Sequence, residues 1–305
     1  MSRVLVASMV LLAACAEEPS SHLPAPRASV TSPIEFTPPA GFTRLRIGLV
    51  PYSNPEALKA AHAPMAAWLS IQLKVPVELV MGENYDDAAA RLERGEVDLV
   101  EFSPYAYVRA ERRLKLRPLV TMISDGSDTA AGYILVRHDS PHRSLEDLRG
   151  GTLAFVDPAS TSGYLYPMKL FKDRGLDVKK DLRSTEFFGN HEKVLMAVYE
   201  GKVNAGATYQ GSLAALQHSK QIDPHNFRII AKTPRTPRDL FCVRADFPAS
   251  LGDALTQVLL RLSSRDQTGR EILAPLNLNG FLPADRHHYD GVRAAAAAVA
   301  PGEAN

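Results

Sequence analysis

The sequence predicts an α/β protein with two lobes, each built on a parallel-sheet α/β unit, joined by a hinge of two extended crossings. Three observations support this fold class. Strand-like and helix-like segments alternate over roughly 60 residues from Arg44, and a second alternating unit begins near Gly132. The run Lys232–Pro237 then supplies a stiff, extended connector, because proline fixes φ and restricts the residue before it.

The composition fits this architecture and excludes several classes of protein. The chain has 305 residues, of which 45% are hydrophobic and 23% are charged, so two domains with cores are feasible. Lys and Arg number 35 against 34 Asp and Glu, and this balance argues against a nucleic-acid binder with a basic face. The two cysteines are too few for a disulfide framework or a thiolate zinc ribbon. We expect no metal and no cofactor.

The first residues are typical of an export signal followed by a tether. Arg3 precedes the apolar run Val4–Ala14, and the ending Leu-Ala-Ala-Cys at Cys15 resembles a bacterial lipobox. We therefore predict a signal peptide at 1–14, lipidation of Cys15 and a flexible tether at 15–43, which would anchor a periplasmic lipoprotein to the membrane. A plain signal peptide or a buried helix are the alternatives.

The first lobe is predicted to comprise 44–133 plus 239–290. A helix capped by Asn54 carries apolar residues at helical spacing, and a second helix runs from Tyr85 to a closing glycine, Gly95. The predicted strands are Leu45–Val50, Val77–Val80, Val97–Glu101 and Leu240–Val243. Cys242 is expected to be a buried core residue of the last strand. A long helix is predicted over Ser250–Ser264.

The second lobe is predicted over 134–238, with a C-terminal tail at 291–305. The tail contains the Ala-rich stretch Val292–Val299, predicted to be a terminal helix or a frayed end. In the lobe, strands are predicted at Tyr133–Val136, Thr152–Val156, Ser184–Phe188 and Val203–Thr208, and helices at Ser144–Leu148, after Gly163 to Arg174, and at His191–Glu200.

The loop Ser160-Thr161-Ser162-Gly163 has the strongest chemical signal. Ligands of such folds bind beyond the carboxyl ends of parallel strands. Three hydroxyls at a helix N-terminus, with free N–H groups and the positive dipole end, suit an oxyanion. The same residues are equally those of an N-cap, so the pattern alone leaves both interpretations open.

Other loops after strands supply weaker candidates. His191 stands at a strand-to-helix junction, where it donates to an anion or merely caps the helix. Asp239, at the second crossing, is a hydrogen-bond acceptor or a turn residue. Tyr52, Phe102 and Tyr105 are aromatics that either line a pocket or pack in the core.

No catalytic motif is present in the sequence. There is no Gly-x-Ser-x-Gly elbow, His-Glu-x-x-His, Walker loop or Gly-x-Gly-x-x-Gly. The segment Ser160–Ser162 offers a nucleophile with His191 as base, and no orienting acid for that histidine is apparent. The residues alone therefore give an enzyme no support, and we expect that the chain is not one.

Four segments together resemble the periplasmic substrate-binding proteins of phosphonate, phosphite and phosphate ABC importers. They are Ile47–Leu69, Tyr85 with Arg91–Leu99, Phe155–Tyr164, and Gly189–Glu192 with Gly201–Asn204. The resemblance implies a type II periplasmic-binding fold that closes on its ligand. It also implies that Ser160, Thr161, Ser162 and His191 contact the anion and that Asp239 accepts a hydrogen bond from its protonated oxygen.

Departures from the family pattern bear on the ligand. Phe102 stands where a similar aminoalkylphosphonate binder has Tyr, and Gly211 where it has a Glu for the amine. Asn204 replaces the usual Asp after Gly-x-Val. The resemblance thus implies phosphite, phosphate, methylphosphonate or another small oxyanion, delivered to an ABC permease. An oxyanion sensor for a signalling kinase, including an arsenite sensor, and a Ser/His hydrolase are the alternatives.

Overall fold

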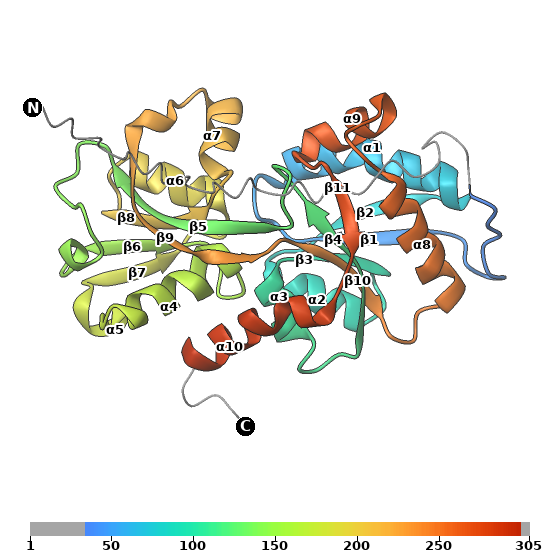
Figure 1. The fold of residues 1–305 in the computed structure, drawn as a ribbon, viewed down its shortest axis with the longest axis horizontal. Coiled ribbons are helices and arrows are strands. Elements are labelled where there is room, and N and C mark those ends of the chain that lie inside the picture. The colour runs from blue at the N-terminus through green and yellow to red at the C-terminus, as the bar shows by residue number, and fades with distance from the viewer. Residues whose placement is uncertain (1–33, 300–305) are drawn as a thin grey trace, which may run out of the picture.

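The computed structural model describes residues 34–299, so the predicted signal peptide, the lipidation site at Cys15 and most of the tether lie outside the described residues. Figure 1 shows two lobes side by side, each with its own sheet. Within the described residues, no helix is both long and apolar enough to span a bilayer.

Lobe 1 is built on a six-stranded sheet with the order β11-β4-β10-β3-β1-β2. Strands β1, β2 and β3 are parallel, and β10, β4 and β11 extend the sheet by antiparallel pairing. The strands are β1 (Leu45–Leu49), β2 (Val77–Met81), β3 (Leu99–Phe102), β4 (Leu116–Ile123), β10 (Leu240–Arg244) and β11 (Gly280–Pro283). The helices are α1 (Pro55–Leu73), α2 (Tyr85–Glu93), α3 (Pro104–Ala110), α8 (Ala249–Arg261) and α9 (Gln267–Leu273).

Lobe 2 is built on a five-stranded sheet with the order β7-β6-β8-β5-β9. Here β6, β7 and β8 are parallel, while β5 is antiparallel to β8 and β9. The strands are β5 (Thr129–Arg137), β6 (Thr152–Phe155), β7 (Ser184–Phe187), β8 (Ala205–Tyr209) and β9 (Phe227–Pro237). The helices are α4 (Tyr166–Asp173), α5 (Val178–Asp181), α6 (His191–Tyr199) and α7 (Ser212–Lys220).

The chain passes between the sheets twice. One crossing joins β4 to β5 through 124–128, and the other joins β9 to β10 at Arg238 and Asp239. Since β5 already belongs to the second sheet at Thr129, we place the first lobe boundary at 124–128 and not at 133.

Several predicted elements need correction. Both sheets are mixed and not purely parallel, because each crossing strand pairs antiparallel to its neighbours. The predicted connector Lys232–Pro237 is the end of strand β9, an edge strand where proline removes no needed hydrogen bond. The predicted helix Ser144–Leu148 is a single 3₁₀ turn at Glu146–Leu148, and α8 ends at Arg261. Cys242 is buried in β10, as predicted.

The C-terminal helix α10 (Asp290–Val299) touches both lobes. It packs against α3 of lobe 1 and α4 of lobe 2, and Figure 1 shows it beneath the junction of the two. Val292, Ala295 and Ala296 are buried, and Arg293 forms a two-bond ion pair with Glu111. Of the predicted tail, the helix up to Val299 is therefore part of the packed structure.

Candidate functional site

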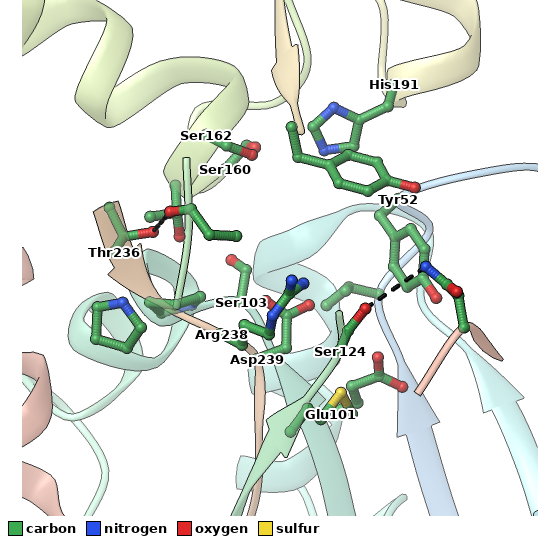
Figure 2. Close-up of a pocket in the computed structure, with 18 of the residues that line it drawn as sticks. Tyr52, Glu101, Ser103, Ser124, Ser160, Ser162, His191, Thr236, Arg238 and Asp239 are labelled. Carbon is green, nitrogen blue, oxygen red and sulfur yellow. Dashed lines mark hydrogen bonds between the residues drawn. The ribbon is translucent and has the colours of Figure 1, made fainter. Parts of the chain in front are cut away.

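A cavity of about 160 Å³ lies between the two lobes, beside both crossings. Loops after β1, β3 and β6, the start of α6 and the Arg238-Asp239 crossing all contribute to its wall. Figure 2 shows Ser160, Ser162 and His191 on one side and Glu101 on the opposite side. The site is thus enclosed by loops that follow strands, as the sequence predicts for ligands of such folds.

The serine-threonine loop lies where β6 ends and a turn of π-helix begins at Thr161. Ser160 Oγ accepts a hydrogen bond from Gly163 N at 3.1 Å. A β-carbon at Gly163 would lie only 2.4 Å from Val156 Cγ2, so only glycine fits there. The loop is therefore both a helix cap and a wall of hydroxyls facing the cavity.

Thr161 and two neighbouring groups hold the lobes together around the cavity. Tyr105 N donates to Thr161 Oγ1 at 2.8 Å, and His191 N donates to Tyr52 O at 3.1 Å. Ser103 Oγ donates to Ala159 O at 3.2 Å. Each bond joins lobe 1 to lobe 2, so the structure is a closed form in which the cavity is walled on both sides.

His191 is buried at the start of α6, which is capped by Asn190. Its Nδ1 lies 3.0 Å from Thr208 Oγ1, and its ring packs edge-on to Tyr209. Burial lowers the pKa of His191 to about 3, so the ring is neutral at physiological pH when the cavity is empty. A neutral imidazole carries one N–H donor and one acceptor, and the tautomer decides which of them faces the cavity.

Asp239 and Arg238 line the cavity at the second crossing. Burial, together with the nearby charge of Glu101, raises the pKa of Asp239 to about 8, although Arg238 acts in the opposite direction. Arg238 Nε donates to Ser127 O, and its guanidinium lies 3.4 Å from the Asp125 carboxylate. Asp239 is therefore mostly protonated at neutral pH beside a fixed cation.

The three aromatic candidates behave differently. Tyr52 lines the cavity, and burial raises the pKa of its hydroxyl well above the usual value. Phe102 does not line it, because alternation along β3 turns Phe102 into the core and turns Glu101 and Ser103 toward the cavity. Tyr105 contributes its backbone N–H, while its ring lies beneath the Arg109 guanidinium and does not line the cavity.

Sequence reasoning missed a buried pair on the lobe 1 side. His62 of α1 places Nε2 2.7 Å from Glu101 Oε2, and its Nδ1 lies 2.8 Å from Leu58 O. Burial lowers the pKa of His62, but the charge and hydrogen bond of Glu101 outweigh it, so the net shift is upward. The available signal was Glu101 in an otherwise apolar strand, where a lone carboxylate needs a partner.

Metal and thiol chemistry find no support among residues 34–299. Within that range, no group of three or more His, Cys, Asp or Glu side chains could hold a metal ion. Cys242 is fully buried in β10 and does not line the cavity. Burial raises the pKa of its thiol well above the usual value, so the reactive thiolate is disfavoured.

Comparison with known proteins agrees with this geometry. Residues 47–289 match the family described as ABC transporter, phosphonate, periplasmic substrate-binding protein. The phosphate-import protein PhnD of Mycolicibacterium smegmatis is 31% identical over 273 residues, which cover 82% of this chain and 84% of that protein.

Two solved structures establish the fold. The binding protein component of an ABC phosphonate transporter from Pseudomonas aeruginosa has a TM-score of 0.79 at 20% identity, covering 84% of this chain and 86% of that one. PhnD1 of Prochlorococcus marinus, in complex with methylphosphonate, has a TM-score of 0.77 at 21% identity, covering 84% of this chain and 98% of that one. The fold is the type II periplasmic-binding fold, and the chain belongs to the family of periplasmic substrate-binding proteins of phosphonate ABC transporters.

Proposed function

We propose that this chain captures a small phosphorus oxyanion (a phosphonate, phosphite or phosphate) and delivers it to an ABC permease. The observation that carries the proposal is the wall of hydroxyls from Ser160, Thr161 and Ser162 beside His191, in a cavity that both lobes close. Uncharged donors at the start of a helix suit an anion, because they offer N–H and O–H groups without requiring a second fixed cation.

Asp239 supports an anion that carries a proton. Below pH 8 the protonated carboxyl donates to an ionised oxygen, and an ionised carboxylate would accept from a protonated one. In either arrangement one proton is shared between Asp239 and the ligand. Sulfate has no proton of its own at neutral pH, so it fits only the protonated form of Asp239, whereas a phosphorus oxyanion fits either form by supplying the shared proton itself. We therefore expect sulfate to bind more weakly than phosphorus oxyanions.

The names of the relatives support the same ligand class. One relative is a phosphate-import protein, and one solved relative is bound to methylphosphonate. We propose binding without turnover, since Ser160 Oγ is engaged by Gly163 N and the relatives are binding proteins. We propose a phosphorus ligand and not arsenite, since Cys242 lies away from the cavity.

Isothermal titration of the soluble form, begun after Cys15, tests the ligand. We expect phosphite, phosphate or methylphosphonate to bind, and we expect no binding of sulfate or arsenite at the same concentrations. Ser160→Ala and His191→Ala should each weaken binding about 10- to 100-fold, the loss expected for a hydrogen bond to a charged group. The matched controls Ser140→Ala and His142→Ala remove a hydrogen-bonded Ser/His pair outside the cavity and should leave affinity unchanged. Silence of all phosphorus anions would refute the proposal.

The membrane anchor rests on the sequence around Cys15. We propose that the acylated cysteine holds the chain at the cell envelope through a tether that ends before Ile34. The predicted tether of 15–43 is too long at its C-terminal end, because Ile34 is buried and Phe36 and Phe42 pack against the lobe 1 core. Expressed with its own N-terminus, the Cys15→Ser variant should move from the membrane fraction to the soluble fraction. An unchanged distribution would refute lipid anchoring and leave the ligand proposal intact.

A further inference from the structure

The lobe 1 side of the cavity ends at the buried pair of His62 and Glu101. Their side chains are 1% and 3% exposed, and both line the cavity. The carbonyl of Leu58 only accepts, so His62 Nδ1 carries a hydrogen and donates to it. One further proton then lies between Nε2 and Oε2, on either atom. The pair is therefore neutral as a whole, whichever atom holds that proton.

Only one oxygen of Glu101 is used by this pair. Oε2 bonds His62, whereas Oε1 makes no hydrogen bond to any residue of the described range 34–299. Oε1 is also not among the fully enclosed polar atoms that lack a partner in that range, so it is reachable from the cavity. The lobe 1 wall thus presents a free hydrogen-bond acceptor that is held in place from behind by His62.

The cavity has room for a ligand that reaches this acceptor. A cavity of about 150 Å³ admits benzene, so the 160 Å³ here exceeds the needs of a bare tetrahedral anion. Figure 2 places Glu101 across the cavity from Ser160, Ser162 and His191. Met122, Leu276 and Leu278 line the cavity as well, and their apolar surfaces suit a methylene chain.

The charges in the cavity wall determine which terminal group the substituent of the ligand can carry. The Glu101 carboxylate is already neutralised by His62, and the Arg238 guanidinium is a cation in the same wall. The remaining acid of the wall, Asp239, shares its proton with the bound anion, so an ammonium group would lose its hydration with no uncommitted anion to compensate it. A hydroxyl needs only one acceptor, and Glu101 Oε1 supplies it.

We propose that Glu101, positioned by His62, forms a second subsite that accepts a hydrogen bond from a hydroxyl on the substituent of the bound anion, so that the chain prefers short hydroxyalkylphosphonates. The inference rests on the proposed function and specifies its substrate class. The acid of this second subsite belongs to lobe 1, opposite the hydroxyl loop of lobe 2.

Three ligands of nearly equal size test the subsite by titration of the wild-type protein. Propylphosphonate, 2-hydroxyethylphosphonate and 2-aminoethylphosphonate differ only in a terminal methyl, hydroxyl or ammonium. We expect the hydroxyl compound to bind at least about tenfold more tightly than the propyl compound. This is the gain in affinity expected from one hydrogen bond to a charged group. We also expect it to bind more tightly than the amine.

Two variants assign the preference to Glu101. Glu101→Met removes the acceptor, and the double variant His62→Leu/Glu101→Met replaces the whole pair with apolar groups, an exchange that buried pairs often tolerate. In both, the ratio of hydroxyl to propyl affinity should fall to about one. Because the ratio is taken within one variant, any change in affinity for the anionic group that both ligands share cancels. Asp98→Asn is the matched control, since Asp98 pairs with Arg46 in the same lobe and does not line the cavity.

The outcomes separate the two proposals. Equal wild-type affinity for the hydroxyl and propyl compounds, with phosphite still bound, would overturn the subsite alone. A preference for the amine would overturn the neutral-donor inference and indicate an uncompensated Glu101 carboxylate. A hydroxyl preference that survives both variants would assign it to another residue. Absence of binding by every phosphorus anion would overturn the proposed function and the subsite with it.

Discussion

The two lobes present different chemistry to the same cavity. Lobe 2 contributes uncharged groups at a loop and a helix start, namely the hydroxyls of Ser160–Ser162 and the neutral ring of His191. Lobe 1 and the second crossing contribute the ionisable groups Glu101, His62, Asp239 and Arg238. Hydroxyls at a helix start suit any small oxyanion. The difference suggests how the proposed function would be divided: lobe 2 would provide affinity for an anion, and lobe 1 would decide which anion is accepted.

The contrast has opposite consequences for stability as pH changes. His191 has a folded pKa below its unfolded value, so its contribution to stability is present above pH 6.5 and is lost as pH falls toward 3. Asp239 has a folded pKa above its unfolded value, so its contribution is present below pH 3.8 and is lost as pH rises toward 8. The ligand-free protein thus loses the His191 contribution as pH falls from about 6.5 toward 3, and the Asp239 contribution as pH rises from about 4 toward 8.

The largest effect is expected from Asp239→Asn. The amide cannot ionise, so the loss of stability between about pH 4 and 8 should disappear, a gain of about 3 kcal/mol in the free energy of unfolding at pH 8. This figure is smaller than the full pKa shift implies, because Asp239 is partly accessible from the cavity. Urea unfolding of ligand-free protein at several pH values measures it. The variant His191→Asn should instead remove the loss in the free energy of unfolding that the wild type shows as pH falls from about 6.5 toward 3. If the free energy of unfolding falls equally steeply between pH 4 and 8 in wild type and in Asp239→Asn, the assignment to Asp239 is wrong.

The lobe 2 residues of the candidate site could be predicted from the sequence, but the lobe 1 pair of His62 and Glu101 could not. Ser160–Ser162 and His191 stand out because local signals mark a strand end followed by a helix start, and the structure places them at the cavity. Glu101 could not be predicted to face the cavity, because the side of the sheet on which it lies depends on the register of its strand. A shift of one residue in that register moves a side chain from the cavity to the core. Phe102, the aromatic candidate next to Glu101, faces the core.

The fold divides in a similar way. The parallel strands β1, β2 and β3 carry compact apolar runs between helix signals and were found from the sequence. Strand β4 was not found, since Arg117 and Pro118 interrupt its pattern and its partners β10 and β11 lie far along the chain. Antiparallel pairing between strands that are far apart in the chain leaves little local signal in the sequence. The sequence therefore predicts parallel sheets where the structure has mixed ones.

A second variant disrupts the serine-threonine loop of lobe 2 without changing any charge. Gly163→Ala puts a β-carbon 2.4 Å from Val156 Cγ2 and 2.8 Å from Ser160 Oγ, so the serine-threonine loop must move. We expect a loss of about 2 kcal/mol in the free energy of unfolding, typical of overpacking, and at least a tenfold loss of affinity for phosphite. Gly291→Ala is the control, because its nearest neighbour would be Tyr166 Oη at 3.8 Å. Wild-type affinity in Gly163→Ala would show that the loop does not hold the anion.

The smallest effect concerns how the two lobes are held together outside the cavity. Arg293 of α10 pairs with Glu111 of lobe 1, while Val292, Ala295 and Ala296 of the same helix are buried at the junction. Arg91 and Asp87 form a pair of nearly equal exposure, 25% and 17% against 25% and 16%, but entirely within α2. Such pairs contribute roughly 0.2–1 kcal/mol to stability.

Comparing Arg293→Met with Arg91→Met therefore separates closure from stability. Both variants should lower the free energy of unfolding by a similar small amount. Only Arg293→Met loosens the hold of α10 on lobe 1, which lowers the fraction of closed protein and raises the apparent dissociation constant about two- to fivefold. Titration with phosphite measures this difference. If both variants bind phosphite as the wild type does, α10 only covers the junction, and closure depends on the hydrogen bonds between lobes at Tyr105, His191 and Ser103.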